Sequence, residues 1–200
     1  MKYFNKILLA SILIVSVCPT SFAMKFYDYT LVGQPDHPIK HTHPLDDLKD
    51  NLKELVVELI DATNQGNAKI VQRLVTTLEC KGIPRGKPAN LRVKDQENSY
   101  HGWTLLQIAA EKGHADVVHV LIVSGANINA KVNNSNSGYH GWTALHIAAW
   151  QFKKGKSQVH AQIVRTLMDA GTNIYAKIDN PSSEHHELTA FALLCPFLCP

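Results

Sequence analysis

The chain has 200 residues, of which 45% are hydrophobic and 18% charged, and its formal net charge is +3. This length supports one domain with a sizeable core, and the composition excludes a disordered chain or a fibre. A charge this close to neutrality also argues against a nucleic-acid-binding protein, which normally presents a strongly basic face.

The first 23 residues have the pattern of a secretory signal peptide. Lys2 and Lys6 precede an uncharged apolar run over residues 7–17. Small side chains at Ser21 and Ala23 then stand at the two positions that a signal peptidase reads. Because the apolar run is only about half of the ~20 residues that a membrane-crossing helix needs, we expect cleavage after Ala23. The mature chain is then expected to be secreted or periplasmic, without a membrane span.

Three cysteines remain after removal of the signal: Cys80, Cys195 and Cys199. In an oxidising compartment an odd count leaves at least one thiol outside any intramolecular disulfide, so the chain is not a disulfide scaffold. Cys80 is expected to end a helix in a half-buried apolar position.

Residues 24–44 contain prolines, histidines and aromatic residues without a period, so we expect a flexible, loosely attached arm. Weak candidate ligands for zinc or copper in this arm are His37, His41 and His43. A second candidate pair is His185 and His186. Since no cysteine accompanies these histidines at ligand spacing, no metal or other cofactor is expected.

A repeated pentapeptide sets the organisation of the remaining chain, residues 45–200. The sequence YHGWT stands at residues 100–104 and again at 139–143, and further identities follow at the same offset of 39. After an insertion of seven residues around Lys153 to His160, the match resumes at an offset of 46, and an offset of 47 finds an earlier, degenerate copy. The resulting units are a degenerate repeat at about 50–92, repeats at about 93–131 and 132–177, and a truncated repeat at about 178–200.

Each unit is predicted to form two short antiparallel helices followed by an extended finger. Thr104 and Thr143 are expected to cap the first helices, and Gly125 and Gly171 to end the second helices in the left-handed conformation. One unit cannot bury its apolar face alone, so the units must stack. An amphipathic helix over 48–60 is expected to cap the N-terminal end of the stack.

The C-terminal end is predicted to hold an incomplete unit. Residues 188–194 can form the first helix of a last repeat, whereas Pro196 and the end of the chain prevent a second one. The apolar residues of this region then either fold back on the preceding repeat or drive self-association.

These units resemble the ankyrin repeat. The pattern GxTPLHxAA, a turn, VVxxLL and GAxxNA is followed by Gly141, Thr143, Ala144, Leu145, His146, Ala148, Ala149, Val164, Leu167, Gly171, Asn173 and Ala176. The resemblance implies an all-α ankyrin-repeat solenoid of stacked helix pairs with extended finger loops. The family period is ~33 residues, whereas the fingers here recur every 39, so each finger is expected to project further than usual.

The resemblance also implies a binding surface made of finger tips and the exposed faces of the first helices. The candidate protein-binding residues on that surface are Tyr100, His101, Trp103, Tyr139, His140, Trp142 and Trp150. Tryptophan and tyrosine are over-represented at binding hot spots. The alternative is that Trp103 and Trp142 stack on each other, or on Tyr100 and Tyr139, and so rigidify neighbouring fingers. His146 is expected to take part in hydrogen bonding at the helix start with Thr143.

The charged insertion and residues 186–190 are two further features of the sequence. The inserted lysines 153, 154 and 156 are expected to form a solvated loop, which could also meet an acidic partner. Residues 186–190 (HELTA) begin like the zinc-protease motif HExxH, but Ala190 stands where the second histidine must be. The sequence therefore predicts a non-enzymatic, exported adaptor or effector-like module that binds a protein partner. The alternative is a periplasmic metal or redox accessory protein that uses the histidine-rich arm and free thiols.

Overall fold

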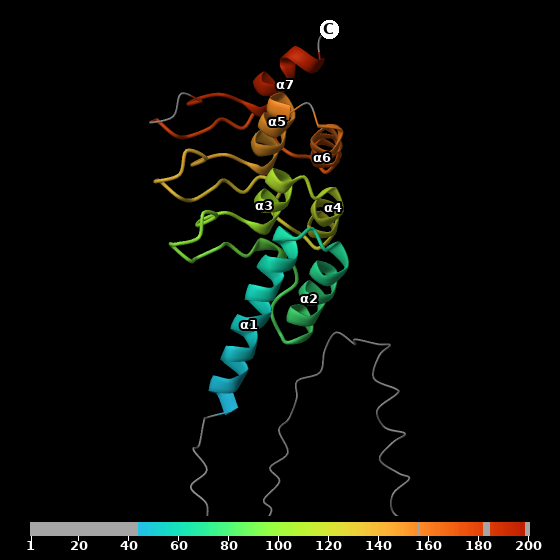
Figure 1. Ribbon diagram of the computed structural model, residues 1–200, viewed down its shortest axis with the longest axis vertical. Coiled ribbons are helices and arrows are strands. Elements are labelled where there is room, and N and C mark those ends of the chain that lie inside the picture. The colour runs from blue at the N-terminus through green and yellow to red at the C-terminus, as the bar shows by residue number, and fades with distance from the viewer. Residues whose placement is uncertain (1–43, 156, 182–184, 199–200) are drawn as a thin grey trace, which may run out of the picture. The chain divides into compact units, whose positions relative to one another are not determined.

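The computed structural model describes residues 44–155, 157–181 and 185–198, which form seven α-helices and one short 3-10 helix (Figure 1). In chain order the elements are α1 (Pro44–Asn64), α2 (Ala68–Cys80), η1 (Pro88–Asn90), α3 (Leu105–Lys112), α4 (Ala115–Val123), α5 (Ala144–Gly155), α6 (Gln158–Asp169) and α7 (Ala190–Leu198). No strand occurs in these ranges. Isolated antiparallel bridges join Arg92 to Thr104 and Lys177 to Thr189.

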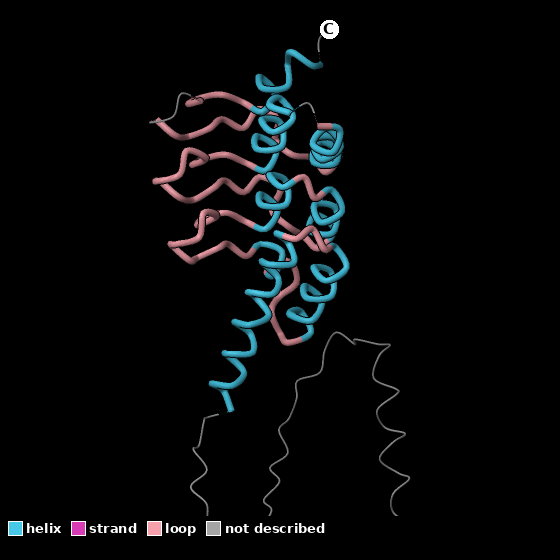
Figure 2. The backbone as a smooth tube through the Cα atoms, in the orientation of Figure 1, coloured by secondary structure: helices cyan, strands magenta, loops and turns pink. Residues whose placement is uncertain are grey.

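The helices stand in two columns (Figures 1 and 2). In the first column α1 packs on α3, α3 on α5, and α5 on α7; in the second column α2 packs on α4, and α4 on α6. Each of the pairs α1–α2, α3–α4 and α5–α6 also packs together. The loops that lead into α3, α5 and α7 project away from the first column as fingers (Figure 2). The predicted all-α solenoid of stacked helix pairs is confirmed.

Local signals set the ends of the short helices. Thr104 caps α3, because its Oγ1 accepts the N–H of Gln107 and the Gln107 Oε1 accepts the N–H of Thr104 at 2.7 Å. Gly113 ends α3 with a φ of 80° and donates its N–H to the carbonyl of Ala109. A helix of eight residues is too short to be stable in isolation, so α3 depends on packing against its neighbours.

The buried apolar side chains form two clusters. The larger cluster lies between the two helix columns and includes Leu59, Leu78, Leu106, Leu121, Leu145, Ile163 and Leu167. The second cluster joins the fingers to the first helices and consists of Val93, Trp103, Ile108, Val132, Trp142, Ile147 and Ile178. Because the fingers have their own core, their bases are packed structures and not free loops.

The first helix confirms the predicted amphipathic cap. Helix α1 begins at Pro44, one residue before the expected domain start, and proline is favoured in a first helical turn. Leu59 is fully buried and Leu55 is half-buried, whereas Lys53 and Glu58 on the other side are exposed. Helix α1 therefore closes the N-terminal end of the described stack with one apolar and one polar face.

Lys153 and Lys154 of the insertion are exposed as expected but lie in a helix and not in a loop, and Lys156 lies outside the described residues. Helix α5 has 12 residues against 8 in α3, and α6 has 12 against 9 in α4, so the two longer helices absorb the whole insertion. Lys153 and Lys154 lie in the last turn of α5. They are therefore held on a helix at a fixed place in the stack.

The last helix packs on the preceding repeat. Helix α7 starts at Ala190 and continues through Pro196 to Leu198, with the N–H of Ala192 donated to the Oγ1 of Thr189 at 3.1 Å. Leu193 and Leu194 are 2% and 3% exposed. The sequence predicts that this apolar region either folds back on the preceding repeat or drives self-association. Leu193 and Leu194 pack on the preceding repeat.

The position of Cys80 also differs from the expectation. Cys80 is the last residue of α2, as predicted, but it is exposed and not half-buried. The apolar face of α2 consists of Val71, Leu74, Val75 and Leu78, and the helix rotation places Cys80 off that face.

Candidate functional site

Three fingers share one hydrogen-bonding scheme at their bases. We define finger 1 as residues 91–103, finger 2 as 130–142 and finger 3 as 176–188, following the offsets of the repeat. In finger 1 the N–H of Gly102 donates to the carbonyl of Val93 at 2.9 Å, and the N–H of Val93 donates to the carbonyl of Trp103 at 3.0 Å. The equivalent pairs close finger 2 at 3.0 and 2.8 Å, and finger 3 at 3.0 and 3.1 Å. The pentapeptide YHGWT is thus a finger-closing motif.

The glycine of that motif permits the fingers to stack closely. A Cβ atom on Gly102 would lie 2.2 Å from the carbonyl oxygen of Asn133 in finger 2, and one on Gly141 would lie 2.9 Å from the backbone nitrogen of Asp179 in finger 3. Both glycines also have a φ of 79°. In finger 3 the same place is taken by Glu187, with a φ of 65°, and no further finger packs against it within the described ranges. Glycine is required where another finger follows.

A continuous row of aromatic rings runs from finger 1 through finger 2 to helix α5. The ring centroids of Tyr100 and Trp103 are 5.3 Å apart, those of Trp103 and Tyr139 are 5.2 Å apart, and those of Tyr139 and Trp142 are 5.2 Å apart. Each pair meets edge to face, which is a favoured geometry for aromatic rings. Trp150 then meets Trp142 at 6.0 Å. These residues form a single stack that links neighbouring repeats.

The burial of the tryptophans corrects their proposed role in contacting a partner. Trp103 is 3% exposed and Trp142 is 1% exposed, so a partner protein cannot reach either indole in this fold. The alternative expectation, in which both indoles stack with Tyr100 and Tyr139, describes the observed arrangement. Buried aromatic pairs of this kind contribute about 0.5 to 1.5 kcal/mol beyond their area burial.

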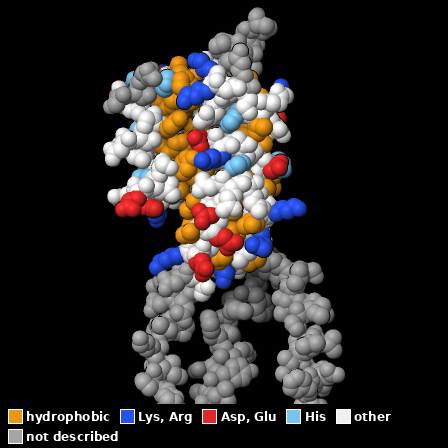
Figure 3. All heavy atoms as spheres, viewed as in Figure 1, with side chains coloured by type: hydrophobic (Ala, Val, Ile, Leu, Met, Phe, Trp, Pro, Cys, Tyr) orange, Lys and Arg blue, Asp and Glu red, His pale blue; other side chains and the backbone are white. Residues whose placement is uncertain are grey.

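The other candidate residues keep part of their surface open. Tyr100, Tyr139 and Trp150 are half-buried, as are His101 and His140 in the finger turns. The two histidines are held by their backbone N–H groups, which donate to the carbonyls of Asn98 and Ser137. Figure 3 shows hydrophobic side chains gathered in a band between the fingers and the helices. We call the surface between the fingers and the first helices α3 and α5 the inner face.

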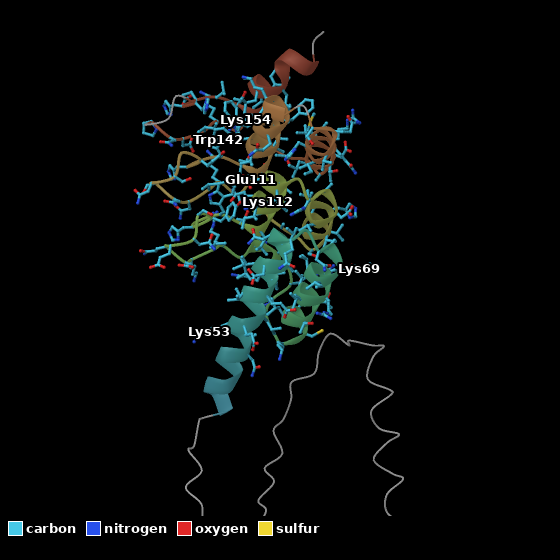
Figure 4. All side chains as sticks on the ribbon, in the orientation of Figure 1. Lys53, Lys69, Glu111, Lys112, Trp142 and Lys154 are labelled. Carbon is cyan, nitrogen blue, oxygen red and sulfur yellow. The ribbon has the colours of Figure 1, made fainter. Side chains whose placement is uncertain are left out.

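Polar groups that belong to no sequence motif also lie beside this aromatic row. The Tyr100 hydroxyl donates to the Glu111 carboxylate at 3.0 Å. Burial raises the pKa of Tyr139, and the negative charge of Glu111 raises it further. The Lys112 Nζ lies 5.3 Å from the centre of the Tyr100 ring. Figure 4 shows Glu111, Lys112, Trp142 and Lys154 one above another along the first helices.

Trp150 carries a second pair of cations. The Nζ atoms of Lys153 and Lys154 lie 5.6 and 5.3 Å from the Trp150 ring centre. His185 packs against the same ring at 4.7 Å. Two of the inserted lysines and His185 of the second histidine pair therefore meet at one aromatic residue.

Gln107 and His146 stand at the same position of successive repeats, three residues after the capping threonine. The Nδ1 of His146 lies 2.8 Å from the Thr143 Oγ1, which confirms the predicted helix-start hydrogen bonding. In the preceding repeat the Nε2 of Gln107 donates to the carbonyls of Ala130 at 2.8 Å and Trp142 at 3.2 Å. Gln107 thereby ties its own helix to the finger that follows.

The imidazole of His146 is held neutral by its surroundings. Its Nε2 faces the carbonyls of Leu188 and Ala176 without reaching the close geometry that Gln107 has. Burial lowers the pKa of His146 to about 4, and the nearby carbonyls offset only part of that effect. The imidazole is therefore neutral at pH 7, and its Nδ1 takes part in the helix-start hydrogen bonding with Thr143.

An apolar groove opens where the aromatic row ends at its N-terminal side. It lies between α1 and finger 1 and has a volume of about 610 Å³. Its apolar lining comes from Leu52, Val56, Val57, Ile60, Leu91 and Val93. At the offset of 47, Val56 corresponds to Trp103 and Lys53 to Tyr100. Val56 and Lys53 lie within helix α1, whereas Tyr100 and Trp103 lie in a finger before α3, so the offset matches these residues in sequence only.

The remaining sequence-based candidates fall partly outside the described structure. The signal peptide, most of the arm and the candidate ligands His37, His41 and His43 lie outside the described residues. In the part that is described, no group of three or more histidine, cysteine, aspartate or glutamate residues could hold a metal ion. Within the same ranges, none of the helices combines the length and the apolar character needed to cross a membrane.

Stacked helix pairs with projecting fingers define a helical repeat protein of the solenoid class. The family model for ankyrin repeats, in three copies, matches residues 59–178, which is more than half of the chain. The chain belongs to the ankyrin repeat family. Ankyrin repeats generally mediate protein–protein interaction, and the family is typically non-enzymatic. No curated protein matches the chain.

Proposed function

We propose that this chain is an exported, non-enzymatic adaptor or effector-like protein that binds a protein partner through its inner face and fingers. The observation that carries the proposal is the row of half-buried rings between fingers and helices, where Tyr100, Tyr139 and Trp150 present part of their surface. Large rings fixed by their neighbours lose little conformational entropy on binding. The inner face therefore presents ring surfaces that need little further ordering to contact another protein.

The proposed export rests on the sequence of the first 23 residues, which has the pattern of a secretory signal. Fusion of residues 1–30 to a reporter enzyme that is active only outside the cytoplasm tests this part. We expect activity with the natural segment and loss of activity when residues 7–17 are interrupted by two charged residues. Reporter activity that is unchanged by the interruption would contradict export through this segment.

The binding role is tested by photo-crosslinking from defined positions on the folded chain. The crosslinking amino acid is placed at Trp150 on the inner face or, as a matched control, at Val123, which is 67% exposed on α4 in the second column. We expect a discrete crosslinked protein from position 150 and none from position 123. Equal crosslinking from the two positions, or crosslinking from 123 alone, would refute the inner face as the binding surface.

A Tyr139→Ala, Trp150→Ala variant provides a second readout, because it removes exposed ring surface while leaving the two buried tryptophans in place. Its circular dichroism spectrum should keep the helical signal of the natural chain. We expect recovery of the crosslinked partner to fall at least tenfold. The control variant Val123→Ser, Val159→Ser changes two exposed apolar side chains of the second column and should recover the partner normally.

A further inference from the structure

Lysines of fingers 2 and 3 form ion pairs with carboxylates, whereas the described lysines of the inner helices do not. Lys131 of finger 2 pairs with Asp179 of finger 3, and Lys177 pairs with Glu187 within finger 3. Lys112, Lys153 and Lys154 are exposed and take part in none of the ion pairs found in the described ranges. Positive charge therefore gathers, without a carboxylate partner, on the surface that carries the aromatic row.

These three lysines are placed over rings. Lys112 lies over Tyr100 in finger 1, and Lys153 and Lys154 lie over Trp150 in α5. A cation over a ring face keeps its charge and gains about 0.5 to 1 kcal/mol at an exposed site. Lysines in a last helical turn also favour the negative end of the helix dipole. The helix dipole therefore explains why these lysines stand at the ends of their helices. It does not neutralise their charge, which is exposed to solvent on the inner face.

The only carboxylate beside these lysines in the described part of the inner helices is Glu111, and it accepts the Tyr100 hydroxyl. The hydrogen bond with Tyr100 raises the pKa of Lys112, and the negative charge of Glu111 adds a smaller increase. The charge on Lys112 therefore stays fixed over the pH range of most compartments. A ligand for this surface must bring negative charge of its own.

The arrangement of α3 and α5 gives the spacing of that charge. The two helices pack directly on each other, and packed helices are separated by roughly 8 to 10 Å. An extended chain advances about 3.3 Å per residue, so about three residues span that separation. Consider a segment that runs along the stack and carries two acidic residues three positions apart. One of its acidic side chains would lie near Lys112 and the other near the Lys153–Lys154 pair.

We propose that the inner face binds an extended acidic segment of its partner protein, with carboxylates about three residues apart facing Lys112 and the pair Lys153 and Lys154. Apolar atoms of the segment would lie on the open edges of Tyr139 and Trp150. This inference rests on the proposed function and names the chemistry of the partner that the same surface recognises. Opposite charge at such a surface speeds the diffusional encounter of the two proteins and fixes the register in which the segment binds.

The test is selection from a phage-displayed library of random twelve-residue peptides against the chain that starts at Met24. We expect the enriched peptides to carry aspartate or glutamate three residues apart. Synthetic copies, labelled with fluorescein, should bind with a dissociation constant that rises at least tenfold when the acidic residues become glutamine or asparagine. Because exposed charges are screened by salt, this difference should shrink between 50 and 500 mM sodium chloride.

A matched pair of triple variants locates the binding. In Lys112→Gln, Lys153→Gln, Lys154→Gln the affinity for the selected peptides should fall at least tenfold. The control Lys69→Gln, Lys81→Gln, Lys87→Gln removes the same charge away from the inner face, with Lys69 on the α2 side (Figure 4), and should change affinity less than twofold. Equal losses in the two variants would indicate bulk electrostatic attraction and would overturn the inference.

The outcomes separate this inference from the proposed function. Peptides that are not acidic but lose binding in the Tyr139→Ala, Trp150→Ala variant would overturn the acidic segment and leave the inner face as a binding surface. Peptides whose binding survives both the aromatic and the inner lysine variants would overturn both proposals. A library that yields no binder also counts against the acidic segment, whereas the crosslinking experiment still decides the function.

Discussion

His146 in the third repeat occupies the place that Gln107 occupies in the second, and both side chains face two backbone carbonyls of the finger that follows. The amide of Gln107 does not titrate, whereas an imidazole can. The protonation of the side chain at this position therefore does not change with pH in the second repeat, whereas it can change in the third.

The first prediction concerns stability against pH. Burial lowers the pKa of His146 to about 4 from its usual 6.5, so the folded state binds its proton less readily than the unfolded state. A lowered histidine pKa gives stability that is complete above about pH 6.5 and is lost as the pH falls toward 4. At pH 5 the loss should be about 2 kcal/mol, since one pKa unit corresponds to about 1.4 kcal/mol.

Urea unfolding at pH 7 and pH 5 measures this loss, and His146→Gln is the matched variant because the neighbouring repeat already has glutamine there. The difference between the two pH values should be about 2 kcal/mol smaller in the variant than in the natural chain. If both proteins lose the same stability between pH 7 and pH 5, then His146 is not the group responsible.

The second prediction concerns the glycines of the fingers. Gly102→Ala should destabilise the fold by about 3 kcal/mol or more, because a Cβ would lie 2.2 Å from the Asn133 carbonyl oxygen and the backbone φ is 79°. Gly171→Ala has the same type of backbone conformation but nothing within 4 Å, so it should cost only about 1 kcal/mol. Gly138→Ala, with neither constraint, should be close to neutral.

Thermal and urea denaturation of the three alanine variants would establish this order. A Gly102→Ala protein as stable as the Gly171→Ala protein would show that fingers 1 and 2 do not stack as closely as described.

The third prediction separates structural from exposed aromatic residues. Trp142→Ala should lower the free energy of unfolding by about 3 to 5 kcal/mol, as large-to-small substitutions of buried aromatic residues do. Its indole is 1% exposed and stacks on Tyr139 and Trp150. Trp150→Ala should cost distinctly less, because that ring is only half-buried. Chemical denaturation with circular dichroism detection checks both values, and similar costs for the two variants would contradict the burial pattern.

The fourth prediction fills the groove at the N-terminal end of the row. Val56→Trp places an indole on helix α1 at a residue that lines a groove of about 610 Å³ with an apolar lining. The extra buried apolar surface should stabilise the fold by about 1 kcal/mol, at roughly 25 cal/mol per Å². Val123→Trp, on an exposed position of α4, should give no comparable gain. The melting temperatures of the two variants decide the matter, and an unchanged or lower value for Val56→Trp would mean that the groove does not accept a ring.

Much of the fold could be predicted because its signals are local and repeated. Thr104 and Gly113 set the ends of α3 through capping and backbone conformation, which depend on neighbouring residues only. The repeat offsets give the position of the insertion in the chain, whereas they do not give its conformation. Its lysines and glycine suggest a solvated turn, whereas packing of α5 against α3, α6 and α7 stabilises a longer helix.

The candidate site was only partly predictable. YHGWT identified the finger base, but sequence alone could not decide whether Trp103 and Trp142 face a partner or one another. Glu111 and Lys112 had no motif to mark them. They could have been found from the rule that the exposed end of a first helix faces the fingers, applied to α3 as it was applied to Trp150.

The sequence by itself determined the register of the repeats, the helix pairs, the capping threonines and the family, because each of these follows from spacing that recurs along the chain. Only the tertiary structure decided which aromatic surfaces are open, which lysines lie over rings and where the row of rings gives way to a groove. Those properties arise between repeats, where side chains separated by tens of residues compete for the same space.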